Sequence, residues 1–477
     1  MMPFFEGNTL LVLLTLFAGF YMAWNIGAND VANAMGTSVG SGALTLQRAL
    51  LIAACLEFAG AFFFGSHVSA TLQSGIVNGE IFSHSPFLLA YGMLAALLAT
   101  GAWLQIASYF GWPVSTTHAI VGGVIGFGAA IGGIDAVYWE NVTFIVTSWV
   151  LSPLFGGVLS FLLFSALRRQ VLYTSDPVAE AKKLTPLLVF IVVTTLALIM
   201  VFKGLQNLNL NLPGWAAVAA SLSVGAISAG LSHLCVKRIR MVPVQTNLHP
   251  YSNEVQGGLD KAKKQLQQVQ AACREETQYQ VEDLIQSITV IAHSLKQAEG
   301  ARVISAEYTI VEKIFGYLQI MSACLMAFAH GANDVANAIG PFSAAMHVLR
   351  TGEIAETTQV PAWALALGGS GIVIGLATWG WRVIATIGKK ITELTPTRGF
   401  AAEFGAAATI LIASQLGMPI STTHTLVGSV IGVGLARGIE ALDLSTMRDV
   451  VVSWIMTVPV SAAITVGFFY LIQASFG

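Results

Sequence analysis

The residues best suited to chemistry are two aspartates that stand in identical surroundings. Asp30 lies in the segment GANDVANA at 27–34, and Asp334 lies in the same eight residues at 331–338. Each has an asparagine one residue before it and another three residues after it. These oxygens suit a small, hard cation if the helix breaks at Gly27 and Gly331 and releases carbonyl groups. The predicted cation ligands are Asn29, Asp30, Asn33, Asn333, Asp334 and Asn337. The alternative is a polar cluster that holds two helices together.

Hydroxyl side chains form a second repeated motif, PVSTTH at 113–118 and PISTTH at 419–424. A proline cannot continue a preceding helix, and a serine two residues later is a natural N-cap. A helix start that presents N–H and O–H donors favours an anion, although such hydroxyls can instead bond to their own helix. His118 and His424 end the motifs, either as proton gates or as structural donors. The predicted anion ligands, with the aspartates, are Asp30, Ser115, Thr116, Thr117, Asp334, Ser421, Thr422 and Thr423.

The spacing of the motifs indicates a duplicated unit. Position 27 precedes Pro113 by 86 residues, and position 331 precedes Pro419 by 88, by subtraction of the residue numbers. Ser148-Trp149 and Ser453-Trp454 form a third echo. We therefore divide the chain into a first repeat, a middle pair of spans, a helical loop and a second repeat, at 1–168, 184–236, 237–312 and 313–477. Internal repeats of this size in a membrane protein are typical of transporters.

Composition places these repeats in a membrane. Hydrophobic residues make up 55% of the chain, charged residues 10%, and the mean hydropathy is +0.72, which excludes an ordinary soluble protein. A crossing needs about 20 apolar residues. We predict an all-α polytopic fold with about 12 membrane segments, arranged five, two and five. The segments are 8–30, 45–66, 86–110, 113–133, 142–167, 184–203, 213–236, 314–340, 361–384, 399–417, 418–436 and 449–475.

The positive charges predict an orientation. The segments 168–183 and 237–313 are rich in Lys and Arg, and such segments lie in the cytoplasm. The first repeat then begins outside and the second inside, so the repeats have inverted topology and both termini lie outside. The large loop is cytoplasmic. The segments that begin at Pro113 and Pro419 are either full crossings or re-entrant, and helices are broken at the repeated motifs.

The doubled GANDVANA, the doubled P-x-S-T-T-H and the length resemble the inorganic phosphate transporter (PiT) family of secondary transporters. The resemblance covers both repeats. It implies a cation-coupled phosphate symporter in the cell membrane that works by alternating access around a midplane site built from both repeats. It also makes Glu57 and Glu403 functional candidates. The residues alone identify these two as intramembrane acids of unknown role.

Other functions remain in competition. A sulfate or other oxyanion transporter of the same fold is the nearest, an anion channel belongs to a different class, and an intramembrane enzyme ranks last because the sequence has no nucleophile elbow or zinc motif. We expect no enzymatic activity and no cofactor. Sodium is the expected coupling cation, with a proton as the alternative through Glu57 or Glu403. The expected partners are inorganic phosphate and the lipid bilayer, with a homodimer left open and no nucleic acid.

Overall fold

The computed structural model describes residues 5–112, 114–201, 213–239, 251–272, 275–355, 358–381, 384, 394–438 and 444–477. Pro113 of the first hydroxyl motif lies outside these residues. The fold is helical. Its α-helices are α1 (Phe5–Gly40), α2 (Leu46–Phe64), α3 (Ser66–Ser74), α4 (Pro86–Phe110), α5 (Thr116–Phe127), α6 (Trp139–Leu167), α7 (Pro177–Ile199), α9 (Gly214–Lys237), α10 (Tyr251–Ala272), α11 (Glu275–Thr351), α12 (Ala362–Thr378), α14 (Pro396–Gln415), α15 (Thr422–Arg437) and α16 (Leu444–Phe476). Short 3-10 helices, η1 (Gly79–Phe82) and η3 (Ile134–Ala136), and π-helices, η2 (Gly128–Gly132) and η4 (Arg168–Leu172), complete it.

Eight of the described helices are long and apolar enough to cross a membrane. The protein is therefore an all-α, multi-pass membrane protein, as its composition predicts. Each of the predicted apolar stretches coincides with a helix. However, α5 has 12 residues and α15 has 16, fewer than the roughly 20 that a crossing requires. The number of crossings therefore stays a prediction.

The chain is interrupted at both hydroxyl motifs, where breaks were expected. Helix α4 ends at Phe110 and is followed by Gly111 at φ 69°, and α14 is followed by Gly417 at φ 68°. This left-handed backbone conformation favours glycine and ends a helix. Ser115 and Ser421, directly before α5 and α15, have an extended backbone, and each short helix packs on the helix before it.

At the GANDVANA motifs the predicted break is wrong. Helices α1 and α11 continue through both motifs. Gly27 and Gly331 mark close helix contacts instead: a Cβ on Gly27 would lie 1.9 Å from the carbonyl oxygen of Ile372, and one on Gly331 would lie 2.1 Å from that of Glu57. An unbroken helix satisfies its own backbone groups, which a membrane interior requires. The glycines therefore permit close packing and release no carbonyl groups.

The two halves of the chain interlock. Helix α1 packs on α12 and α11 packs on α2, while α6 packs on α15 and α16 packs on α5. Each of these contacts joins one half to the other. The α1–α12 contact corresponds to the α11–α2 contact, and the α6–α15 contact corresponds to the α16–α5 contact. Helices α1 and α11 also contact one another, and the buried aspartates of the two repeated motifs, Asp30 and Asp334, lie close together.

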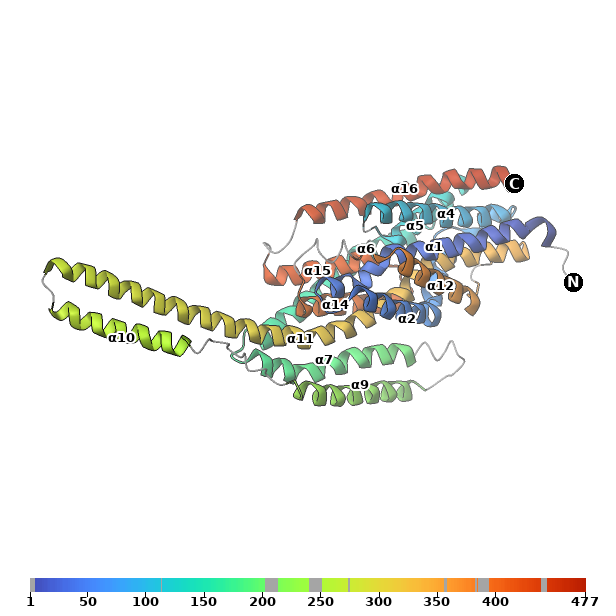
Figure 1. The fold of residues 1–477 in the computed structure, drawn as a ribbon. Coiled ribbons are helices and arrows are strands. Elements are labelled where there is room, and N and C mark those ends of the chain that lie inside the picture. The colour runs from blue at the N-terminus through green and yellow to red at the C-terminus, as the bar shows by residue number, and fades with distance from the viewer. Residues whose placement is uncertain are drawn as a thin grey trace.

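Two helix pairs lie outside this core (Figure 1). Helices α7 and α9 run side by side along one edge of the bundle. Helix α10 pairs with the first part of α11, and this hairpin projects from one end. Helix α11 has 77 residues, so the domain boundary at 313 falls inside one continuous helix. Helix α11 therefore continues without a break from the segment 237–312 into the second repeat.

Candidate functional site

Two short helices begin with the hydroxyl triplets. The Ser115 hydroxyl accepts a hydrogen bond from the backbone N–H of His118 at 3.2 Å, and Ser421 accepts one from His424 at 3.2 Å. Both serines are therefore N-caps, as their position after a proline predicts. The two triplets are buried. Each cap uses the serine oxygen as an acceptor, which leaves the hydroxyl proton available to a ligand.

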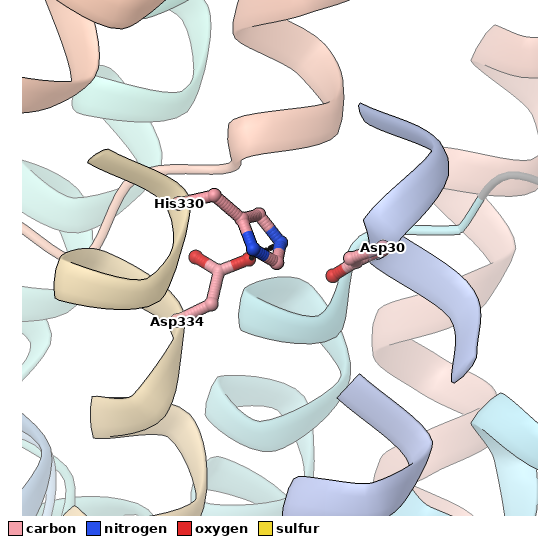
Figure 2. Close-up of side chains that lie close together, drawn as sticks. All are labelled: Asp30, His330 and Asp334. Atoms are coloured by element: carbon pink, nitrogen blue, oxygen red, sulfur yellow. Dashed lines mark ion pairs between the residues drawn. The ribbon is translucent and has the colours of Figure 1, made fainter. Parts of the chain in front are cut away.

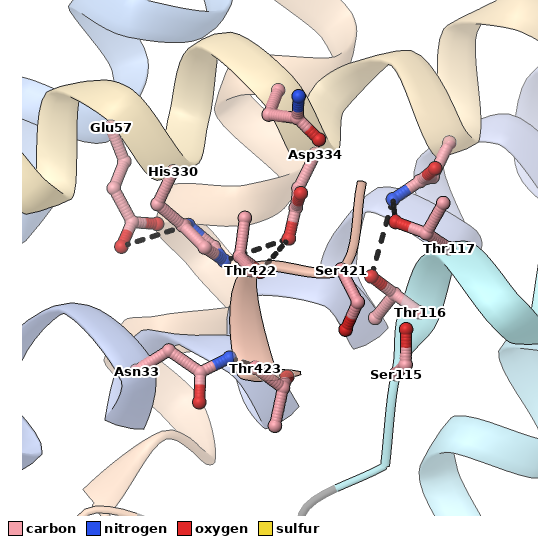
Figure 3. Close-up of polar contacts among 12 residues, drawn as sticks. Asn33, Glu57, Ser115, Thr116, Thr117, His330, Asp334, Ser421, Thr422 and Thr423 are labelled. Atoms are coloured by element: carbon pink, nitrogen blue, oxygen red, sulfur yellow. Dashed lines mark hydrogen bonds and ion pairs between the residues drawn. The ribbon is translucent and has the colours of Figure 1, made fainter. Parts of the chain in front are cut away.

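The inner asparagines join each half to the hydroxyls of the other half (Figure 3). Asn33 on α1 donates to Thr423 Oγ1 at 2.8 Å. Asn337 on α11 donates to Thr116 Oγ1 at 3.2 Å and to Thr117 Oγ1 at 3.1 Å. These reciprocal bonds bring both triplets to one place between α1 and α11.

The outer asparagines hold the connections that precede the triplets. Asn29 donates to Ser108 Oγ at 2.9 Å, and the amide of Asn333 contacts Ser414 Oγ at 2.9 Å. Ser108 and Ser414 lie near the ends of α4 and α14 and are buried. Asn29 Oδ1 has no hydrogen-bond partner among the described residues. Its oxygen therefore stays available as a cation ligand.

The two aspartates converge with a histidine (Figure 2). Asp30, His330 and Asp334 each offer a ligand atom, and these atoms lie within 4.8 Å of one another. His330 Nε2 lies 3.1 Å from Asp334 Oδ2, which also accepts from Thr422 at 2.8 Å. In the described part of the chain, the carboxylate oxygens of Asp30 have no well-formed hydrogen bond. A bound cation would satisfy this buried carboxylate.

A third carboxylate extends this cluster. Glu57 Oε1 on α2 lies 3.3 Å from His330 Nδ1, and both side chains are fully buried. With all three carboxylates ionised and the imidazole protonated, the cluster carries two negative charges, by three minus one. A cation bound here would offset the cost of burying these acids together.

Glu403 lies in a different environment. Its carboxylate accepts hydrogen bonds from Thr37 and Ser38 of α1 and from Gln319 and Ser322 of α11. The Ser38 and Ser322 bonds are both 2.6 Å. Because four donors from two helices surround it, Glu403 ties α14 to both central helices.

The histidines of the hydroxyl motifs stack in a row of four rings. The ring centres of His118 and Trp149 are 3.8 Å apart, those of His118 and His424 are 4.2 Å apart, and those of His424 and Trp454 are 3.5 Å apart. The tryptophans come from α6 and α16, so the row joins both halves behind the triplets. This packing gives the histidines contacts between the halves, and the choice between proton gates and structural donors stays a prediction.

Comparison with known proteins places the fold and the site in a family. The profile of the family described as "Phosphate transporter family" matches residues 26–465, which include both copies of both motifs. The chain belongs to the phosphate transporter family. It is 46% identical over 460 residues to "Inorganic phosphate transporter 2-1, chloroplastic" of Arabidopsis thaliana, covering 96% of this chain and 71% of that protein. A solved structure, "The sodium-dependent phosphate transporter", matches with a TM-score of 0.79 and 36% identity over 98% of this chain and 99% of that one.

In this member of the phosphate transporter family, the two halves differ at one paired position. Gly331 faces the carbonyl of Glu57, and the matching Gly27 faces that of Ile372. His330 precedes Gly331, and Ile26 precedes Gly27. The ionisable pair Glu57–His330 therefore stands where the other half has two buried isoleucines. The predicted cation ligands omitted His330, although its contrast with Ile26 is visible in the sequence.

Other parts of this transporter's site had weaker sequence signals. Trp149 and Trp454 were visible only as an echo of the repeat, and their contact with the histidines depends on the fold. Ser108 and Ser414 did have a signal that the predicted ligands omitted: each ends an Ile-Ala-Ser tripeptide five residues before the proline of its hydroxyl motif, by subtraction of the residue numbers. Their contact with the asparagines depends on the packing of α4 on α1 and of α14 on α11.

Proposed function

We propose that the chain is a cation-coupled inorganic phosphate symporter that works by alternating access around one site built from both repeats. The reciprocal bonds of Asn33 to Thr423 and of Asn337 to Thr116 and Thr117 support this most directly. A site shared by two halves changes its access when one half moves against the other. Membership of a transporter family supports phosphate over a sulfate substrate and over an enzymatic role.

Phosphate binds between the two triplets in this proposal. Ser115, Ser421 and Thr423 accept hydrogen bonds from asparagine or backbone N–H groups, so their O–H groups can donate to a ligand. Thr116 accepts from Asn337, and its hydroxyl also interacts with Asp30. Thr117 and Thr422 complete the triplets, but their protons are directed to Ile420 O and Asp334 Oδ2. The N-termini of α5 and α15 add the positive ends of two helix dipoles, which attract an anion. Asp30 and Asp334 can accept the proton that phosphate, unlike sulfate, carries at neutral pH.

The coupling cation binds next to the phosphate, between Asp30 and Asp334. Asn29, Asn33, Asn333 and Asn337 supply further oxygens, and His330 lies within reach of both aspartates. We assign sodium, because these are hard ligands and the matching solved structure is titled as sodium-dependent. Two like charges about 4 Å apart repel by about 4 kcal/mol at an effective dielectric constant of roughly 20. Phosphate therefore enters favourably only after a cation has neutralised the carboxylates.

A specific observation supports proton coupling as the second candidate. Glu57, His330 and Asp334 form a buried chain of ionisable groups that begins at α2 and ends at the triplet of α15. Such a chain can carry a proton. Glu403 fits this role less well, because its four hydrogen-bond donors hold it as a structural acceptor.

Uptake into proteoliposomes tests the function and the coupling ion together. Sodium and proton gradients are imposed separately, and labelled phosphate is measured inside. We expect accumulation above the external concentration under the sodium gradient and little response to the proton gradient. Uptake that never exceeds equilibrium indicates an anion channel. Uptake driven by protons alone rejects sodium and makes Glu57 the first residue to test.

A further inference from the structure

A basic pocket lies at the end of the bundle where α11 continues into the hairpin with α10. It has a volume of about 170 Å³. Its lining includes Arg168, Tyr173, Tyr308, Glu312, Arg398 and Arg437. These residues come from α6 and η4 of the first half and from α11, α14 and α15 of the second. The pocket therefore lies between the two halves, away from the aspartates.

The described lining of the pocket is rich in positive charge. It contains three arginines and one glutamate, a difference of two positive charges, by three minus one. The glutamate is already used: Glu312 Oε2 accepts from the backbone N–H of Thr397 at 2.8 Å and from its hydroxyl at 2.9 Å. Arg168 donates to the carbonyl of Ala436, at the end of α15, and to the Tyr173 hydroxyl.

The start of α14 adds donors to the same pocket. Thr395 is the N-cap residue of α14 and lines the cavity, and its buried hydroxyl oxygen has no hydrogen-bond partner in the described part of the chain. The Tyr308 hydroxyl interacts electrostatically with Arg168 and Arg398. Guanidinium forks, hydroxyls and a helix start are the groups that bind a phosphate group.

The fold itself does not require this pocket. Phe164 borders it and follows Trp149 by 15 residues, and Phe469 follows Trp454 by the same 15, by subtraction of the residue numbers. At this matching place in the other half, Phe469 packs against Phe127, which stacks on Phe82. One corner of the repeat is thus filled with aromatic rings, and its counterpart is a cavity lined with arginines.

We propose that this pocket binds a phosphate group, carried either by free phosphate or by an anionic phospholipid headgroup. Both carry a tetrahedral oxyanion that matches two net positive charges, and the pocket lies at the edge of the predicted membrane region. In the predicted orientation it faces the cytoplasm. A ligand here bridges α6 to α14 and α15 and therefore affects how the halves move. The inference does not depend on the proposed central site.

Binding measurements on the full-length protein test the proposal. The variant carries Arg398→Gln and Arg437→Gln. The matched control carries Arg169→Gln and Lys183→Gln, two exposed charges at the same end that do not line the pocket. One arm measures the stoichiometry of labelled inorganic phosphate in phosphatidylcholine nanodiscs. The other counts phosphatidylglycerol molecules that remain bound in native mass spectrometry.

A loss of one bound phosphate in the variant alone identifies free phosphate as the ligand, and a loss of one phosphatidylglycerol identifies the headgroup. Where a ligand remains detectable, we expect its affinity to fall by at least about ten-fold. Equal binding by variant and control in both arms overturns the proposal.

If the double variant does not fold, Tyr308→Phe replaces it, because this change removes only a hydroxyl. If the variant loses the ligand of the pocket but still takes up phosphate, only the pocket is affected. If uptake is lost and the ligand of the pocket stays bound, only the proposed function is affected.

Discussion

At the scale of single residues, Thr423 is the clearest test of phosphate binding. Its hydroxyl accepts from Asn33 and keeps its proton for a ligand. Thr423→Val removes this donor at nearly constant volume, so we expect phosphate binding to weaken by roughly 1–3 kcal/mol. Equilibrium phosphate binding and the KM for uptake measure the loss. Thr117→Val changes the matching residue of the other triplet, whose proton is directed to Ile420 O, so we expect a smaller loss of phosphate affinity.

The matched control for this change is Thr409→Val. The Thr409 hydroxyl bonds only to its own helix, at Gly405 O, among the described contacts. It lies on α14, outside both triplets, and should leave affinity unchanged. Normal affinity in both triplet variants would count against the hydroxyl assignment.

Asp30 tests the cation site. It is buried and lacks well-formed hydrogen bonds, whereas Asp334 already has Thr422 and His330 beside it. Asp30→Asn keeps an oxygen but removes the charge, so we expect sodium stimulation of uptake to disappear. The exposed Asp135, changed to Asn, controls for the loss of an acid. Sodium dependence that survives in the Asp30 variant contradicts the assignment.

Glu403 is predicted to act through stability. In Glu403→Gln the four donors lose one acceptor oxygen, and the new amide places N–H groups against other donors. We expect the free energy of unfolding to fall by about 1–3 kcal/mol. Thermal unfolding in detergent measures it, with the exposed Glu140→Gln as the control. An unchanged unfolding temperature combined with lost transport would instead give Glu403 a direct role.

At the scale of helices, the crossing of α11 over α2 depends on close approaches at Gly60 of α2 and Gly331 of α11. A Cβ on Gly331 would lie 2.1 Å from a backbone carbonyl, which a small rotation cannot relieve. We expect Gly331→Ala to lower the unfolding temperature strongly and to abolish uptake. Gly316 lies on the same helix with nothing within 4 Å of its Cβ position, so Gly316→Ala should be neutral or slightly stabilising. Equal stability of the two variants would disprove the close contact.

The sequence predicted local features of these helices better than contacts between them. Ser115 and Ser421 were identifiable as caps, because capping depends on residues a few positions apart. The GANDVANA break was predicted wrongly, because glycine permits both a break and a close approach, and only the neighbouring helix decides between them. The pairing of Glu57 with His330 could not be predicted, since it joins residues 273 positions apart, by subtraction of the residue numbers.

At the scale of the whole molecule, the interlocked halves explain why the chain needs two copies of each motif. Helix α1 supplies Asn33 to the triplet of α15, and α11 supplies Asn337 to that of α5. In the proposed function, neither half therefore holds a complete site. The Glu57–His330 pair then makes the shared site asymmetric, which gives one half a chemistry that the other lacks.

The orientation of this molecule is open to a direct test. The positive-inside rule places both chain ends outside and the α10–α11 hairpin in the cytoplasm. Ser475 is exposed near the end of α16, and Lys264 is exposed on α10. In a background without Cys55, Cys235, Cys273 and Cys324, we expect a membrane-impermeant maleimide to label Ser475→Cys in intact cells. Lys264→Cys should react only after the membrane is opened. The reverse pattern would invert the predicted topology. Labelling of both sites in intact cells would place them on the same side of the membrane, so the number of crossings between them would be even and not odd.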